Sequence, residues 1–318
     1  MGLDMILNEL SFGMVAEDVR SARERMTGLV ETARMCVQCG TSRALRTKPD
    51  INEVELAVGY NIARWRNDDL VDRELRRYFG SLTAKAPLLA ADLNIEQLNT
   101  HAVSEILIDG QVAEGLGFAW LMGTLAVSIR SDVRWEADFL AVRIRALNND
   151  GEIEERDSTV HHASQPNHAS RHAPWISDNK RSSITGGEDL WRRRDDLFPH
   201  LAFVHDTEAQ ICPLHINGPI FHNVVNMLFD LEFYFATWAA GPFRADQIRR
   251  RITPESEATL LQYRQERTFT CPDGVSIVFS WHGRLTPGDW RLYFHPETRS
   301  RRCVVGYIGP HLPTVRFN

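Results

Sequence analysis

The chain has 318 residues, of which 43% are hydrophobic and 25% are charged, and its formal net charge is −6. This is the composition of an ordinary globular protein, which excludes collagen-like, disordered and small disulfide-framework chains. No apolar run reaches the length of about eighteen residues that a membrane span needs. The start of the chain, Met1–Met5, lacks the basic and apolar regions of a secretory signal. We therefore expect a cytoplasmic protein without a membrane partner.

The first part of the chain predicts a mixed α and β domain over residues 1–150. Met5–Phe12 reads as an opening strand, and apolar residues at helical spacing predict a helix over Ala16–Met35. A second helix is predicted over Asp69–Lys85. Apolar and basic residues alternate along Phe139–Leu147, which predicts a half-exposed strand.

The segment 151–190 is polar and rich in histidine, and it has almost no hydrophobic periodicity. We interpret it as a loop that links two domains. Beyond it, 191–318 forms a second α+β domain. A strongly apolar helix is predicted over Ile220–Ala239, and Thr253 is predicted to cap a further helix that ends near Arg267.

Three strands are predicted near the C-terminus, over Val275–Leu285, Trp290–His295 and Arg302–Ile308. Strand alternation places polar side chains of the first two strands on one face: His282, Arg284, Arg291, Tyr293 and His295. The apolar side chains Phe279 and Trp281 are expected to share the opposite face.

The polar face has the residue types needed to cleave RNA without a metal. Attack by the 2′-hydroxyl needs a base for that hydroxyl, an acid for the leaving oxygen and fixed positive charge for the phosphate. Histidine serves as base or acid near neutral pH, and arginine binds phosphate in a planar, bidentate way. Tyrosine donates a proton or stacks on a base. The same face also suits nucleic-acid or protein binding without chemistry.

A resemblance to a known family supports this hypothesis. Three segments, His282–Leu285, Trp290–Phe294 and Val304–Leu312, resemble the RelE/ParE toxin superfamily, with the similarity covering about residues 200–314. The resemblance implies a C-terminal domain with helices packed on a small antiparallel sheet. It also implies that Arg284 and Arg291 bind phosphate and that His311 is the acid or base. A toxin or phage-defence role and an antitoxin or defence-complex partner are further implications.

Charge along the chain favours nucleic acid as the partner. Residues 242–318 contain twelve Arg, no Lys and seven acidic residues, so this end is basic while the rest of the chain is acidic. We predict that His295, Arg301 and Arg302 contact nucleic acid together with Arg284 and Arg291. The whole chain has 33 Arg and only 3 Lys, however, so a general preference for arginine also explains part of this excess.

Two other groups of residues suggest metal or redox chemistry. Four histidines lie within twelve residues and offer zinc ligands for a metal-dependent hydrolase: His161, His162, His168 and His172. Their spacing matches no zinc signature, and a solvated loop is the competing interpretation. Cys36 and Cys39 have CxxC spacing, but they follow a predicted helix and have no second pair, so we interpret them as ordinary thiols.

The sequence thus predicts an α+β protein whose C-terminal domain is a metal-independent, RelE-like ribonuclease without a cofactor, regulated by its N-terminal domain. The first alternative is a non-catalytic subunit that binds nucleic acid or protein. The second is a zinc hydrolase that uses the four histidines.

Overall fold

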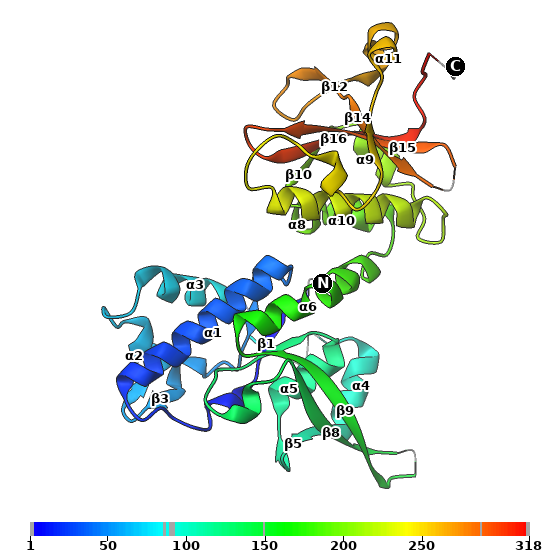
Figure 1. Ribbon diagram of the computed structural model, residues 1–318. Helices are drawn as coiled ribbons and strands as arrows, with labels where there is room; N and C mark the ends of the chain where they lie inside the picture. Colours follow the sequence, from blue (N-terminus) through cyan, green and yellow to red (C-terminus); the bar gives the residue numbers. More distant parts are fainter. Residues whose placement is uncertain (1–2, 85–86, 89–92, 149, 287, 316–318) are drawn as a thin grey trace. The chain divides into compact units, whose positions relative to one another are not determined.

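The fold was analysed in a computed structural model that describes residues 3–84, 87–88, 93–148, 150–286 and 288–315 (Figure 1). The chain forms two compact units, Met1–Lys180 and Arg181–Asn318, which we call unit 1 and unit 2. Both units contain helices and sheets, which confirms the α+β class. Among the described residues, no helix combines the length and the apolar character that a membrane span requires.

Unit 1 is built on one mixed sheet. Its helices are α1 (Val19–Cys39), α2 (Ile62–Arg66), α3 (Arg73–Thr83), α4 (Ile95–Val103), α5 (Glu114–Met122) and α6 (Pro166–Ser182). Its strands are β1 (Met5–Leu7), β2 (Leu45–Arg46), β3 (Glu55–Ala57), β4 (Tyr60–Asn61), β5 (Ser104–Ile108), β6 (Gln111–Val112), β7 (Leu125–Val127), β8 (Phe139–Leu147) and β9 (Ile153–Ala163). Within the described residues the sheet order is β2-β1-β7-β9-β8-β5-β6, and β3 pairs with β4 separately.

The parallel half of this sheet is buried on both faces. β1 pairs in parallel with β2 and β7, and β7 pairs in parallel with β9. Met5 and Leu7 join the core beneath α1, while Ile6 points to the second core beside α5. Since both faces are covered, the strand is a continuous apolar run rather than an alternating one.

Several predictions for unit 1 are confirmed. The half-exposed strand Phe139–Leu147 has the predicted bounds, and the first helix is present as Val19–Cys39. The opening strand ends at Leu7, earlier than predicted, and a short 3₁₀ turn follows it. The helix predicted over Asp69–Lys85 is Arg73–Thr83, and Lys85 lies outside the described residues.

The prediction that 151–190 is a linking loop is wrong. Most of this segment forms β9 and α6, and the boundary between the units falls after Lys180. Charge pairing explains why hydropathy failed here: β9 lies beside β8 with Asp157 opposite Arg143 and Glu155 opposite Arg145, and both pairs are ion pairs. Such cross-strand pairs stabilise a strand without any apolar alternation.

Unit 2 contains a sheet in the order β10-β16-β15-β14-β11 and a separate hairpin of β12 and β13. Its strands are β10 (Leu201–Phe203), β11 (Ile252–Pro254), β12 (Thr268–Thr270), β13 (Ser276–Val278), β14 (Trp281–Leu285), β15 (Trp290–Glu297) and β16 (Arg302–Pro310). Its helices are α7 (Gly187–Arg192), α8 (Arg194–Leu197), α9 (Thr207–Ile211), α10 (Phe221–Thr237) and α11 (Glu257–Gln262).

The two faces of the unit 2 sheet have different cover. Helix α10 packs against one face, where Leu292 and Phe294 of β15 enter the main core (Figure 1). The β12–β13 hairpin contributes Phe269 to a smaller core on the other face, which also contains Tyr293. The polar face predicted from the sequence is therefore partly covered rather than fully solvated.

Two predicted elements of unit 2 need correction. The strand Val275–Leu285 is broken after Val278, because β13 pairs with β12 while β14 joins the main sheet. As a result Phe279 enters the small core and Trp281 packs against the main core, so the two do not share a face. In addition, Thr253 lies in β11 and caps no helix, since the N-cap of α11 is Ser256.

Candidate functional site

Strands β14 and β15 bring four of the predicted residues together. In their antiparallel register His282 lies opposite Tyr293, and Arg284 lies opposite Arg291. Directly opposed side chains on one face are neighbours, at about 5 Å between Cβ atoms. His311, just beyond the end of β16, has its ring centre 6.1 Å from that of His282. The structure thus groups five residues that were predicted from strand alternation and from the family resemblance.

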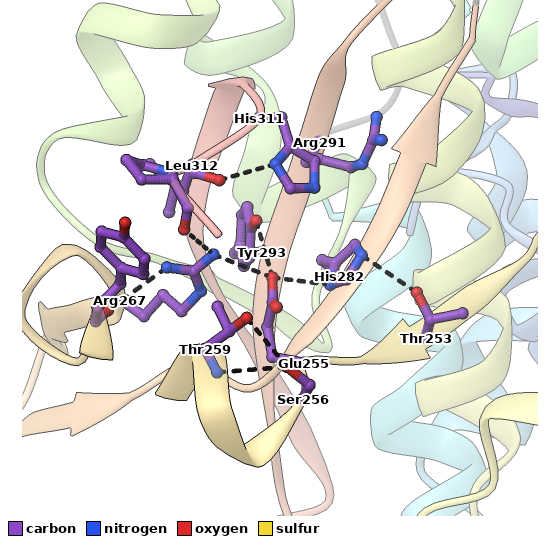
Figure 2. Close-up of polar contacts among 12 residues, drawn as sticks. Thr253, Glu255, Ser256, Thr259, Arg267, His282, Arg291, Tyr293, His311 and Leu312 are labelled. Carbon is purple, nitrogen blue, oxygen red and sulfur yellow. Dashed lines mark hydrogen bonds and ion pairs between the residues drawn. The ribbon is translucent and has the colours of Figure 1, made fainter. Parts of the chain in front are cut away.

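A carboxylate that the sequence analysis missed lies at the centre of this group (Figure 2). Oε1 of Glu255 accepts hydrogen bonds from Nη2 of Arg267, at 3.2 Å, and from the hydroxyl of Tyr293, at 3.1 Å. Nδ1 of His282 lies 3.5 Å from the same oxygen. We call Glu255, Arg267, His282 and Tyr293 the Glu255 cluster.

The ion pair within the Glu255 cluster is deeply buried. The side chain of Arg267 is 0% exposed and that of Glu255 is 5% exposed. Arg267 also donates to the carbonyl oxygens of Pro313 and Tyr263. Buried charges are tolerated only where they are paired and hydrogen-bonded in this way.

Local sequence gave little sign of Glu255 or Arg267. Glu255 follows β11, whose pairing with β14 puts Thr253 opposite His282. The sequence pattern predicts a helix start at these residues, which places Glu255 in a helical turn rather than beside a strand. A prediction of the strand before Glu255 would have placed this carboxylate beside a neighbouring strand. Local sequence does not show which strand that neighbour is.

His282 is held in its neutral form. Burial lowers its pKa to about 4, with Glu255 opposing this shift and Arg291, His311 and Arg267 adding to it. Its Nε2 lies 3.1 Å from the hydroxyl oxygen of Thr253. Its buried Nδ1 makes no hydrogen bond with any described residue.

The tautomer of His311 follows from its partner. Nδ1 lies 2.7 Å from the carbonyl oxygen of Leu312. A carbonyl can only accept a hydrogen bond, so Nδ1 carries the proton and donates it. Nε2 of His311 consequently keeps a lone pair that can take up a proton.

The arginine pair, Arg284 and Arg291, has no matching negative charge. Arg291 is only 6% exposed, and its Nη1 donates to the carbonyl oxygen of Trp290. Burial, and then the charge of Arg284, lower the pKa of Arg291; Asp289 and Glu255 oppose the shift but form no ion pair with it. Among the described residues, neither arginine has an ion-pair partner. Two opposed cations of this kind destabilise a sheet unless an anion lies between them.

Two predicted nucleic-acid contacts, Arg301 and Arg302, lie away from the arginine pair. Glu297 pairs with Arg302 at one end of the β15–β16 ladder, while Arg291 lies near the other end. Six residues of strand separate these ends, which is roughly 20 Å. Arg301 donates to the carbonyl of Trp238, at 3.4 Å. Arg301 and Arg302 therefore lie outside the site that the arginine pair forms, and their contact with nucleic acid stays a prediction.

His295 and Tyr293 also differ from expectation. The ring of His295 lies beside Phe279, with 6.0 Å between ring centres, under the hairpin side of the sheet. Tyr293 is fully buried and donates to Glu255, so it cannot stack on a nucleic-acid base. Burial, and then Glu255, raise its pKa.

The four histidines of unit 1 do not form a zinc site. His162 donates from Nδ1 to the carbonyl of Ala137 and lies 2.7 Å from the hydroxyl of Ser128. His161 stacks on Trp175. The remaining two side chains have their own partners, His168 with Gln165 and His172 with the carbonyl of Asp138. Within the part of the chain that the structure describes, no three His, Cys, Asp or Glu residues are placed to hold a metal ion.

The CxxC pair lies in the last turn of α1, as the interpretation of ordinary thiols expects. Cys36 is buried, and burial raises the pKa of both Cys36 and Cys39. A raised pKa leaves little thiolate, which is typical of ordinary rather than reactive thiols.

Comparisons with protein-family models, with curated proteins and with solved structures found no match to this chain.

Proposed function

We propose that unit 2 is a metal-independent, RelE-like ribonuclease whose phosphate site is the arginine pair. One observation carries this proposal: Arg284 and Arg291 face each other across two strands without a counter-ion among the described residues. A phosphodiester supplies the missing negative charge, and guanidinium groups bind it in a bidentate way.

The neighbouring His311 acts as the base. Nε2 of His311 takes the proton of the RNA 2′-hydroxyl, the bond from O2′ to phosphorus forms, and the bond from phosphorus to O5′ breaks. The arginine pair stabilises the negative charge that builds up on the phosphate oxygens and on the leaving oxygen, which then takes a proton from water. The products are a 2′,3′-cyclic phosphate and a 5′-hydroxyl end.

The Glu255 cluster acts as support in this mechanism. Its buried ion pair fixes the floor of the site, and neutral His282 lies between that floor and His311. The resemblance to RelE-like toxins supports the proposal: a Trp-Arg-Leu-Tyr-Phe strand precedes a final strand that contains Gly309 and is followed by His311. The biological role that we propose is that of a toxin or defence effector, which unit 1 regulates.

The test is cleavage of a labelled RNA in EDTA by the wild-type chain, Arg284→Ala, His311→Gln and Arg302→Ala. Arg284 and Arg302 are both exposed, so neither substitution should disturb folding. We expect Arg284→Ala and His311→Gln to lower the rate by about 10²-fold or more, while Arg302→Ala keeps the wild-type rate. Equal rates in all four proteins, or salt-sensitive binding without cleavage, would contradict the proposal, and the latter would favour a non-catalytic subunit.

A further inference from the structure

A second basic site lies in unit 1, far in sequence from the residues discussed above. Helices α2 and α3 border an open cavity of about 650 Å³, a size typical of small-molecule sites. Six of its lining residues are basic or carboxamide side chains: Asn52, Arg66, Asn67, Arg73, Arg76 and Arg77. No carboxylate is among the described residues that line it.

The four arginines are concentrated by helix geometry. Arg73, Arg76 and Arg77 follow one another at i, i+3 and i+4 on α3, a spacing that places side chains on one helix face. Arg66, at the end of α2, adds a fourth guanidinium. Like charges at this spacing destabilise a helix when nothing neutralises them.

The described part of the chain neutralises little of this positive charge. Nη1 of Arg66 donates to Oδ1 of Asn52, and Nη1 of Arg76 donates to the carbonyl oxygen of Arg66, but both acceptors are uncharged. No hydrogen bond or ion pair links Arg73 or Arg77 to any described residue. Arg76 reaches Asp69 at 3.7 Å, but that carboxylate is fully exposed, so the pair contributes little. The Nε of Arg76 is buried and has no hydrogen-bond partner among the described residues.

Asp72 and Gly80, which lie near the cavity, leave room in it for an anion. Asp72 caps α3 by accepting hydrogen bonds from the backbone of Glu74 and Leu75. Gly80 lines the cavity, and a Cβ at this position would stand 3.2 Å from Nη2 of Arg66. A glycine inside a helix is destabilising relative to alanine, yet here it leaves room beside a guanidinium.

We propose that this cavity binds the phosphate chain of a nucleotide-sized ligand, such as a nucleoside triphosphate. Three guanidinium groups within about one helical turn match the closely spaced charges of linked phosphates. A nucleic-acid strand would instead need cations spread along its backbone. Nδ2 of Asn52 and Oδ1 of Asn67 supply hydrogen bonds to the sugar or base, since the other carboxamide atoms already bond Arg66 and the carbonyl of Ala63. This proposal does not depend on the proposed ribonuclease activity, and its test is separate.

The test uses titration calorimetry on the full chain with inorganic tripolyphosphate, ATP, adenosine and a 20-nucleotide RNA. The double variant Arg73→Gln/Arg77→Gln removes two exposed cations from the cavity. A matched control, Arg20→Gln/Arg143→Gln, removes two exposed cations elsewhere in unit 1. Circular dichroism of each variant checks that it remains folded.

We expect tripolyphosphate and ATP to bind the wild-type chain and adenosine not to bind. The double variant should bind both phosphates at least tenfold more weakly, while the control stays within twofold of wild type. No binding of either phosphate, or an equal loss in the control, would overturn the proposal. If RNA binding depended on Arg73 and Arg77 while tripolyphosphate did not bind, the proposal would be wrong and the cavity would instead bind a nucleic-acid strand.

Discussion

Glu255 balances the charge of a fully buried arginine, so its role is separable from phosphate binding. Glu255→Gln keeps the shape of the side chain but leaves Arg267 buried without a counter-charge. Removing one partner of a buried ion pair costs about 3–5 kcal/mol. We therefore expect the free energy of unfolding, measured by urea denaturation, to fall by that order. Arg284→Ala, an exposed change, should shift it by less than about 0.5 kcal/mol. A Glu255→Gln protein as stable as wild type would show that the pair does not support the fold.

His282 makes stability depend on pH. Its folded pKa of about 4 lies below the ordinary value of 6.5, so between these values the unfolded chain binds a proton that the folded chain does not. The free energy of unfolding should therefore fall as pH drops from about 6.5 toward 4.

A His282→Asn variant isolates this contribution. Burial also lowers the pKa of His161 and His162 to about 4, and both remain in the variant. We expect thermal denaturation at pH 7, 6, 5 and 4 to give a flatter profile for His282→Asn than for wild type. Parallel profiles would mean that His282 titrates normally in the folded protein.

The residues of the candidate site were partly predictable because strand alternation is a local rule. His282, Arg284, Arg291 and Tyr293 share a face because each strand places every second side chain on the same side. Glu255 and Arg267 were not predictable. Glu255 reaches the site through the pairing of β11 with β14, and Arg267 through the short 3₁₀ turn that follows α11. Such long-range pairing leaves no mark on local periodicity.

At the scale of elements, β16 contains a bulge that lets the hairpin approach the sheet. The register shifts between Tyr293 and Phe294 on β15, so Gly306 is the additional residue on β16. A Cβ on Gly306 would lie 2.6 Å from the ring of Phe279 and 2.9 Å from that of Phe269. The absence of a side chain here is what allows both rings to cover the small core.

Gly306→Ala is therefore expected to destabilise the protein by about 1–3 kcal/mol through overpacking. Gly28→Ala is the control, because a Cβ there meets nothing within 4 Å, and it should be neutral or stabilise α1 by about 0.5–1 kcal/mol. Urea denaturation of both variants measures this difference. Equal stability of the two variants would contradict the close packing of Phe269 and Phe279 against Gly306.

Elements with apolar periodicity were predicted well, and elements held by polar contacts were not. The helix Phe221–Thr237 and the strand Phe139–Leu147 follow their hydrophobic patterns. Helix α6 buries His168, Ala169, His172 and Ile176 at helical spacing, but histidine counts as polar in a hydropathy pattern. The buried face of α6 therefore has helical spacing in the sequence, but two of its residues are histidines and a hydropathy pattern does not count them as buried.

On the scale of the whole molecule, each unit has its own hydrophobic cores. Among the described residues, the cores of unit 1 are formed by residues of unit 1 and the cores of unit 2 by residues of unit 2. The boundary after Lys180 does not coincide with the change from an acidic to a basic chain, because residues 181–241 contain eight acidic residues and four Arg, and the basic excess begins at residue 242. The two proposed anion sites fall in different units, which is why one can fail without affecting the other.

The chemistry of the products tests the central claim most directly. The purified chain would be incubated in EDTA with one RNA oligonucleotide and with the DNA of the same sequence, and the fragment ends would be identified by mass spectrometry. Attack by the 2′-hydroxyl predicts that only the RNA is cut, giving 2′,3′-cyclic phosphate and 5′-hydroxyl ends. Intact RNA, cleavage of the DNA as well as the RNA, or fragments with 5′-phosphate ends would contradict the account.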